Sequence, residues 1–166
     1  MIFLAVGTQF PFDRLVKAVD GAVTELSLGE EIIAQTGEGS YVPRNFKAVP
    51  FIDKNLFEKY ISQASSVISH AGMGTIAAVL GCRKPMLVMP RQQKYGEVVN
   101  DHQLAIARKF EMSGHILVAY EAQDLAGKIN QLKTFVPRER DSQHQMVAER
   151  IARFLTEISG EQKFGE

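Results

Sequence analysis

The chain has 166 residues, of which 45% are hydrophobic and 23% are charged, and its 19 basic residues balance 19 acidic ones. This length and composition are typical of one globular domain with its own core, and the zero net charge gives no indication of a nucleic-acid partner. The single cysteine, Cys82, excludes an internal disulfide framework and a cysteine-based metal cluster. No apolar run reaches the roughly 20 residues that a membrane-spanning helix needs, so we expect a soluble, cytoplasmic chain.

Apolar runs alternate with amphipathic segments along almost the whole chain. Pro11 suits the first turn of a helix, and Asp53 is a candidate N-cap. In chain order, the expected elements are a strand at 2–6, a helix at 12–26, strands at 31–36 and 46–51, a helix from 54 to 64, a strand at 66–69, an alanine-rich helix that ends before Pro85, a strand at 86–89, a helix near 98–111, a strand at 115–119, and helices at 121–133 and 143–159. We expect a single domain over 1–159, followed by a flexible tail at 160–166.

Strands rich in Val and Ile that alternate with helices predict an α/β fold. The expected architecture is a Rossmann-like parallel sheet of about six strands with helices on both faces. In such sheets ligands bind beyond the carboxyl ends of the strands. The loops that follow the expected strands are therefore the candidate functional segments.

The segment 70–75, His-Ala-Gly-Met-Gly-Thr, lies where the fourth strand gives way to a helix. Gly72 and Gly74 allow the backbone to approach a ligand closely, and the start of the helix offers unpaired N–H groups that suit a phosphate. His70 and Thr75 can donate further hydrogen bonds. A tight turn beside a structural histidine explains the same residues, so both interpretations stay open at this point.

The loop after the first strand has the same layout, with Gly7, Thr8 and Gln9 ahead of a helix. Two glycine turns at one edge of a sheet favour a shared ligand. Neither turn matches the GxxxxGK[ST] phosphate loop or the GxGxxG dinucleotide fingerprint. ATPase and NAD-dependent functions are therefore disfavoured.

The loop after the fifth strand is long and polar. It contains Arg91, and it ends in the run from Asn100 to Gln103 just before an apolar pair. That run predicts a helix start whose amide and carboxylate groups suit sugar hydroxyls. A solvated loop is the alternative for the charged members, including Arg91. The four histidines are scattered, so no zinc site is expected.

Together these segments resemble the donor-binding half of GT-B glycosyltransferases, of the family 28 C-terminal type. The resemblance covers roughly 1–155 and rests on the opening VGTQFPFDRLVKAVD and on the motifs HAGMGT, VMPR and NDHQLA. The length resembles that of small stand-alone subunits of two-part enzymes. One kind is the cytosolic subunit of the eukaryotic dolichol-linked N-acetylglucosamine transferase, and the closer kind is a bacterial exopolysaccharide subunit.

The resemblance implies roles for the matching positions. The loop at 70–75, with Gly72, Met73, Gly74 and Thr75, would bind the donor diphosphate, and His70 would be the catalytic histidine that contacts the phosphate. The other implied donor-binding residues are Phe51 and Ile52 for the uracil, Asp101, His102 and Gln103 for the sugar with Arg91 near its end, and Gly7 and Thr8 facing the cleft toward the acceptor half. The sequence departs from the pattern at Ala78, where many members carry a glutamate that holds the ribose hydroxyls.

The function that the resemblance implies is that of a catalytic, donor-binding subunit in a two-component glycosyltransferase. It would be an inverting hexosyltransferase for polysaccharide, in particular exopolysaccharide, biosynthesis, with a UDP-sugar as substrate and no cofactor or metal. No residue is a convincing base for the acceptor hydroxyl, and no acceptor half is recognisable. The implied partners are a membrane-anchored acceptor-binding subunit and a lipid-linked sugar acceptor at the cytoplasmic face of the membrane.

Two other functions stay open from the residues. A nucleotide-binding regulatory or scaffold subunit without catalysis is favoured by Ala78, and an unrelated flavodoxin-like cofactor binder is the third. A surface that receives a partner is expected near the first loop, where Phe10, Pro11, Phe12 and Arg14 are the candidates. Packing of the three apolar residues in the core is the alternative.

Overall fold

The computed structural model describes residues 1–138 as a six-stranded parallel sheet in the order β3-β2-β1-β4-β5-β6. The helix expected at 143–159 and the tail at 160–166 lie outside the described residues. The strands are β1 (Ile2–Ala5), β2 (Ile32–Gln35), β3 (Lys47–Val49), β4 (Ser66–His70), β5 (Met86–Met89) and β6 (Leu117–Val118). The helices are α1 (Asp13–Glu25), α2 (Lys54–Gln63), α3 (Met73–Gly81), α4 (His102–Met112) and α5 (Leu125–Leu132), with 3-10 turns η1 (Gln93–Tyr95) and η2 (Ala122–Asp124).

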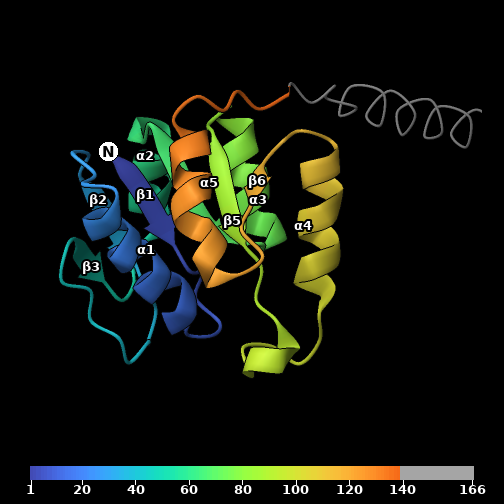
Figure 1. Cartoon of the computed structure of the whole chain (residues 1–166), viewed down its shortest axis with the longest axis horizontal. Coiled ribbons are helices and arrows are strands. Elements are labelled where there is room, and N and C mark those ends of the chain that lie inside the picture. Colours follow the sequence, from blue (N-terminus) through green and yellow to red (C-terminus); the bar gives the residue numbers. More distant parts are fainter. Residues whose placement is uncertain (139–166) are drawn as a thin grey trace, which may run out of the picture.

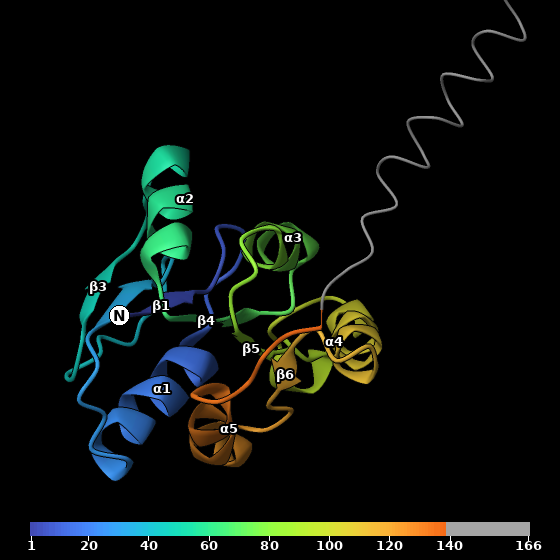
Figure 2. The ribbon, with the colours of Figure 1, turned by 90° about the horizontal axis from the view of Figure 1, so that it is seen from above.

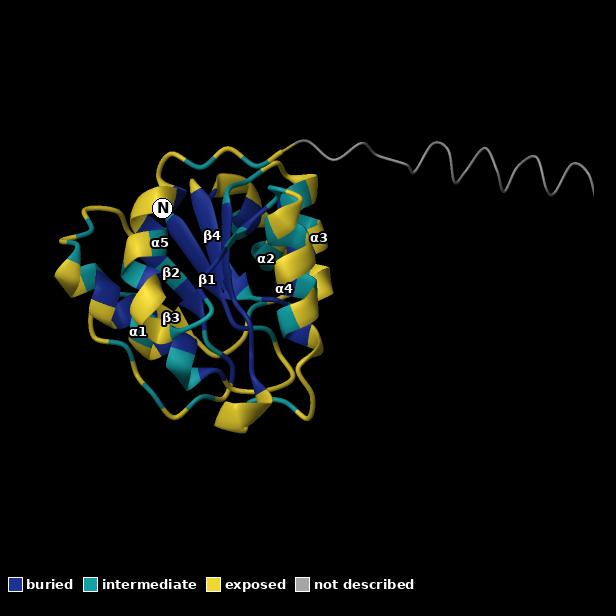
Figure 3. Cartoon of the chain, turned by 45° about the vertical axis from the view of Figure 1, so that its right-hand side comes forward, coloured by how far each residue is buried: buried dark blue, intermediate teal, exposed yellow. Residues whose placement is uncertain are grey.

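Helices cover both faces of the sheet, as the alternating pattern predicts. Figure 2 shows α1 and α5 on one face and α2, α3 and α4 on the other, and two apolar clusters fill the layers between them. The strands β1 and β5 are buried along their length and β4 is buried up to its last residue, the half-buried His70, whereas the outer faces of the helices are exposed (Figure 3). A strand that is covered on both sides cannot alternate polar and apolar residues, which is why these strands are continuous apolar runs in the sequence.

The fold class expected from the sequence is confirmed, and so is the N-cap at Asp53, whose carboxylate accepts a hydrogen bond from Leu56 N at 2.9 Å.

The helix expected near 98 begins instead at His102. The preceding residues form the turn η1, which ends at Gly96 with a φ of +68°. Residues 97–101, between this turn and His102, are not helical. None of the described helices is long and apolar enough to span a bilayer.

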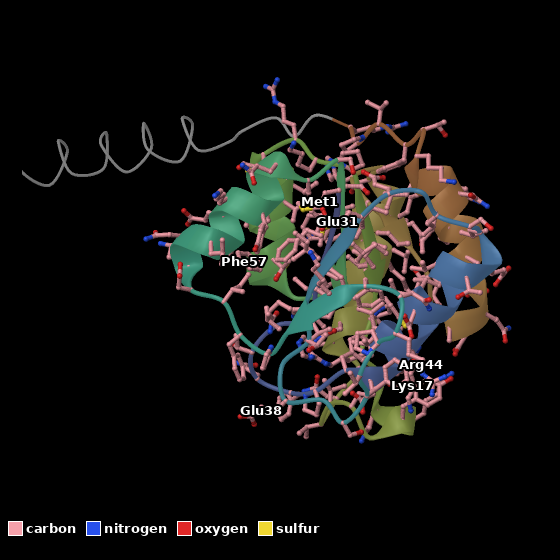
Figure 4. All side chains as sticks on the ribbon, turned by 90° about the vertical axis from the view of Figure 1, so that its left-hand side faces the viewer. Met1, Lys17, Glu31, Glu38, Arg44 and Phe57 are labelled. Carbon is pink, nitrogen blue, oxygen red and sulfur yellow. The ribbon has the colours of Figure 1, made fainter. Side chains whose placement is uncertain are left out.

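The strand order reverses direction between β1 and β4, which are neighbours in the sheet, with Ile2 paired to Ser66, although β2 and β3 lie between them in the chain. At such a switch point the connecting loops diverge to opposite faces and leave space beyond the carboxyl ends of the strands. In Figure 4, Met1 and Glu31 at the amino ends of β1 and β2 lie at the opposite end of the sheet from Glu38, which follows β2. Figure 1 shows η1 projecting at the same carboxyl edge.

Candidate functional site

The loops after β1 and β4 meet at the imidazole of His70. Gly7, with a φ of +83°, and Gly72 both face this ring. A Cβ atom at Gly7 would stand 2.8 Å from His70 Cε1, and one at Gly72 would stand 2.2 Å from His70 Nε2. Both distances are shorter than carbon atoms tolerate, so the two glycines provide the space that the imidazole occupies. The sequence predicts that the two glycine turns share a ligand. In the structure the two turns meet at the imidazole of His70.

The hydrogen bonds of His70 define which ring nitrogen carries the proton. Ser69 Oγ donates its single proton to the carbonyl of Ala5 at 2.5 Å, and it also lies 3.2 Å from His70 Nδ1. Because the hydroxyl proton is already used, Ser69 Oγ accepts a hydrogen bond from Nδ1–H. Nε2 is then left as an unprotonated acceptor in the neutral ring. Burial, together with the positive charge of Arg91, lowers the pKa of His70 from 6.5 to about 4, so the ring is neutral at physiological pH.

The first turn of α3 lies directly beside this ring. Gly72 is the N-cap of α3 and provides no side-chain cap for the helix, and Met73 and Gly74 are exposed. A Cβ atom at Gly74 would meet nothing within 4 Å. The N-terminus of the helix therefore presents backbone N–H groups and a positive dipole end to the open side of the site, an arrangement that suits an anion such as a phosphate.

A buried glutamine that sequence reasoning missed holds two loops of the site together. Gln35, the last residue of β2, is 2% exposed. Its Nε2 donates to the carbonyls of Gly7 and Pro50, both at 2.9 Å, and its Oε1 accepts from Gly7 N at 3.2 Å. The loop after β1 is thereby tied to the loop that contains Phe51 and Ile52. The only sequence signal was a polar residue in an otherwise apolar strand.

Arg91 does not face solvent, contrary to one expectation from the sequence. Its side chain is 3% exposed, and its Nη2 donates to the carbonyls of Val6 at 2.7 Å and Phe10 at 2.5 Å. Gln103 is also buried, and its Oε1 accepts a hydrogen bond from Arg91 N at 3.0 Å. Arg91 therefore supplies donors to carbonyls of the first loop, and Gln103 accepts from the backbone of the loop after β5. A contact of Gln103 with the donor sugar stays a prediction, and Arg91 acts on the site through the first loop and through its charge.

A second arginine fastens the loop after β5 to α1. Arg14 donates from Nε and Nη2 to the two carboxylate oxygens of Glu97, at 2.7 and 2.9 Å, and from Nη2 to the carbonyl of Pro90 at 2.9 Å. Its guanidinium also lies over the ring of Tyr95, 4.4 Å from the ring centre. Phe12 is 1% exposed. Arg14 and Phe12 are therefore part of the interior of this edge and not of a partner-facing surface.

The residues expected at the sugar end lie at the start of α4. Asp101 and His102 are exposed. Asp101 Oδ1 accepts a hydrogen bond from Gln93 N at 2.8 Å, and His102 Nδ1 lies 2.5 Å from Asn100 Oδ1. Thr8 is exposed as well. Within residues 1–138, no three His, Cys, Asp or Glu side chains are gathered as a metal-binding group would require.

Adding a methyl group at Gly72 should displace the imidazole of His70. We expect Gly72→Ala to lower the free energy of unfolding by about 2 kcal/mol, because its Cβ would overlap a ring that is already enclosed on its other side by Gly7. Gly74→Ala is the matched control, since it adds a Cβ in open space of the same helix and should raise stability by about 0.5 kcal/mol. Urea denaturation of both variants measures the difference, and equal midpoints would contradict the close approach at Gly72.

Comparison with known proteins gives one family for almost the whole chain. The family described as "Glycosyltransferase family 28 C-terminal domain" matches residues 1–158. The human UDP-N-acetylglucosamine transferase subunit ALG13 is 34% identical over 124 residues, which are 69% of this chain and 10% of the human protein. A UDP-N-acetylglucosamine--N-acetylmuramyl-(pentapeptide) pyrophosphoryl-undecaprenol N-acetylglucosamine transferase of Geobacillus kaustophilus is 27% identical over 132 residues, or 76% of this chain and 36% of that enzyme. The chain therefore spans between 10% and 36% of the length of these two relatives.

Two solved structures share the fold. MurG of Acinetobacter baumannii superimposes with a TM-score of 0.62 at 21% identity, over 81% of this chain and 42% of that chain. The NMR structure of ALG13 gives a TM-score of 0.59 at 20% identity, and the match covers 90% of this chain and 93% of that one. At such identities the likeness establishes the architecture alone, which is a Rossmann-like parallel sheet with helices on both faces.

Proposed function

The chain belongs to the family of glycosyltransferase family 28 C-terminal domains, and from this premise we propose that it is the donor-binding, catalytic subunit of a UDP-sugar glycosyltransferase. The observation that carries the proposal is the meeting of two glycine turns at His70, beside the open N-terminus of α3 and at the switch point of the sheet. The site combines backbone N–H groups, a helix dipole and one imidazole, which are the groups that bind a diphosphate.

The proposed donor extends across the carboxyl edge. The uracil contacts the backbone of Phe51 and Ile52, the diphosphate lies at 70–75, and the sugar lies toward Asp101 and His102. As the diphosphate leaves, negative charge grows on its oxygens, and the N–H groups at the start of α3 stabilise that charge together with His70. The acceptor hydroxyl attacks the opposite face of the sugar, so the reaction inverts the configuration. In this proposal the chain's own groups stabilise the leaving group without a metal or other cofactor.

The identity of the sugar is proposed from the relatives. The human and Geobacillus proteins are both named as UDP-N-acetylglucosamine transferases or subunits of one, which favours N-acetylglucosamine over other hexoses as the transferred group. The exopolysaccharide pathway rests on the sequence motifs alone. Transfer of N-acetylglucosamine to a lipid-linked sugar is compatible with that pathway.

The acceptor is proposed to come from a membrane-anchored partner at the cytoplasmic face of the membrane. Large apolar side chains that are exposed occur in the loops at the carboxyl edge and in the first turn of α3. They are Phe10 at 49% exposure, Phe51 and Met73 at 48%, Tyr95 at 45% and Val99 at 83%. Apolar side chains around a polar site are typical of an interface, and a partner that closes over the donor would cover them and exclude water from the reaction. Such a partner would also supply the base that the site lacks.

Isothermal titration calorimetry with UDP and UDP-N-acetylglucosamine tests the proposal. We expect one site per chain, with CDP and ADP binding at least about tenfold more weakly because the backbone contacts to the base are specific for uracil. Absence of binding by any uridine nucleotide, with the partner present, would remove the transferase function. The alternative, a regulatory subunit without catalysis, is favoured by Ala78. It predicts that UDP still binds, and that the reconstituted pair keeps its full turnover when His70 is replaced.

A further inference from the structure

The side chain of Arg91 crosses the carboxyl end of β4. In the sheet, β4 lies between β1 and β5 (Figure 2), and neighbouring strands are about 4.8 Å apart. Arg91 follows β5, yet its Nη2 donates to the carbonyl of Val6, directly after β1, at 2.7 Å. His70 is the last residue of β4 and pairs in register with Met89 of β5. The guanidinium therefore spans the strand end that carries the imidazole.

The same guanidinium fixes both ends of the first loop. Its Nη2 also donates to the carbonyl of Phe10 at 2.5 Å, so one group binds the carbonyls on either side of residues 7–9. Because Arg91 is buried, these two carbonyl oxygens point into the protein. An anion at the open side of the site then does not meet their negative ends.

The positive charge of Arg91 has no carboxylate partner among residues 1–138. Glu97, the acid whose charge acts on Arg91, binds Arg14 through both carboxylate oxygens, at 2.7 and 2.9 Å. Two guanidinium groups therefore share one carboxylate, and one positive charge is left over. Arg91 is 3% exposed, and its Nε is buried with no hydrogen-bond partner in the same part of the chain. Since an unpaired buried charge is costly, this arrangement indicates a site that an anion completes.

The surroundings of His70 make it sensitive to that charge. Gly7 and Gly72 face the ring from the first loop and from the start of α3, and Ser69 contributes a hydroxyl from β4, so these three neighbours are uncharged. Arg91 reaches the ring from the loop after β5. Burial and then the charge of Arg91 lower the pKa of His70 from 6.5 to about 4. An anion that offsets the charge of Arg91 would remove the second of these effects.

We propose that Arg91 is a positioning residue of the site, which holds the first loop across the end of β4 and places beside His70 a positive charge that an anionic ligand neutralises. That this anion is the diphosphate of a nucleotide sugar rests on the proposed function. Before the ligand arrives, the charge of Arg91 keeps the imidazole neutral. The two negative charges of the diphosphate then outweigh the single unpaired positive charge, and the ring takes up a proton. Ligand binding and protonation of His70 are thus coupled through Arg91.

The first test measures the protonation of His70 in the full chain without ligand, from imidazole ¹⁵N chemical shifts at pH 5. With a pKa of about 4, about one-tenth of the rings should be protonated in the unmodified protein. Arg91→Gln removes the charge and keeps an amide donor, so it should raise the pKa by about one unit and the protonated fraction to about one-half. Arg91→Lys keeps the charge and should leave the fraction unchanged. Lys94→Gln removes an exposed cation of the same loop and is the matched control, also without effect.

Calorimetry with UDP-N-acetylglucosamine extends the test to the ligand. Arg91→Gln should weaken binding about tenfold, whereas Arg91→Lys should stay within about threefold of the unmodified protein. Equal protonation of His70 in Arg91→Gln and in the unmodified protein would overturn the assignment. An equal loss of affinity in both variants would do the same, because a purely structural contact predicts it.

Two further outcomes are separated by the design. If Arg91→Gln does not fold, Arg91→Lys still decides, because a tenfold loss of affinity in a folded lysine variant would contradict a role for the charge. Failure of the unmodified chain to bind any uridine nucleotide would overturn the proposed function. The protonation measurement uses no nucleotide, so it decides the role of Arg91 independently of that function.

Discussion

If the proposed function holds, replacing His70 by alanine should lower the turnover of the proposed pair of this chain and an acceptor-binding partner by about 10²–10³-fold, the usual loss when a group that stabilises developing charge is removed. The imidazole is enclosed between Gly7 and Gly72, beside the first turn of α3, where the proposal places the diphosphate. The measurement is kcat with UDP-N-acetylglucosamine and a lipid-linked acceptor in the reconstituted pair.

His115→Ala is the matched control, because His115 precedes β6 and lies at the opposite edge of the sheet. It should leave kcat within twofold of the unmodified pair. Circular dichroism of both variants verifies that the fold is intact. If turnover is the same with and without His70, the residue has no part in the reaction, and the regulatory function becomes the better interpretation.

Binding of the diphosphate should be accompanied by uptake of up to one proton per chain at pH 6–7. In the free protein Nδ1–H donates to Ser69, so Nε2 has no proton to offer, and the diphosphate of a UDP-sugar, which lacks the monoester proton that UDP has near pH 6, has none to donate. The contact therefore needs the imidazolium form. Calorimetric titrations of UDP-N-acetylglucosamine in buffers with different ionisation enthalpies measure the uptake, which His70→Ala should abolish. Zero uptake in the unmodified protein would show that the proton resides on Nε2.

The same pKa makes the free protein less stable in acid. The pKa of His70 is lowered to about 4 by burial and by the charge of Arg91, from an ordinary value of 6.5, so the unfolded chain binds the proton more readily than the folded one. The contribution to stability is complete above pH 6.5 and is lost as the pH falls through 6.5 toward 4. It amounts to about 3 kcal/mol for this one group. Saturating UDP should reduce this loss, because the ligand favours the charged ring.

Local patterns predicted the sheet, its two helical layers and the position of the glycine turn after β4, because these depend on apolar periodicity and on glycines next to strand ends. The buried polar contacts could not be predicted in the same way. Arg91 binds carbonyls 85 and 81 residues earlier in the chain, and Gln35 joins two loops that follow different strands. A charged residue in a polar loop has the same local pattern whether it is solvated or buried. Only the packing of the strands places the unpaired carbonyls beside it.

The helix start at His102 illustrates the same limit on a smaller scale. Apolar spacing alone extends the helix back to about 98, but the turn at Gly96 and the hydrogen bond from Gln93 N to Asp101 keep the intervening residues out of it.

The three hydrogen bonds of Gln35 have a consequence for the energetics of donor binding. They keep the loop after β1 and the loop that leads to Phe51 at a constant separation before any nucleotide arrives. In the proposed function these loops hold the base and the phosphates, so the two subsites would be preorganised and little conformational entropy would be lost at this edge when the donor binds. The proposal then predicts that water is excluded by a rigid-body approach of the partner over the donor, rather than by the ordering of these loops.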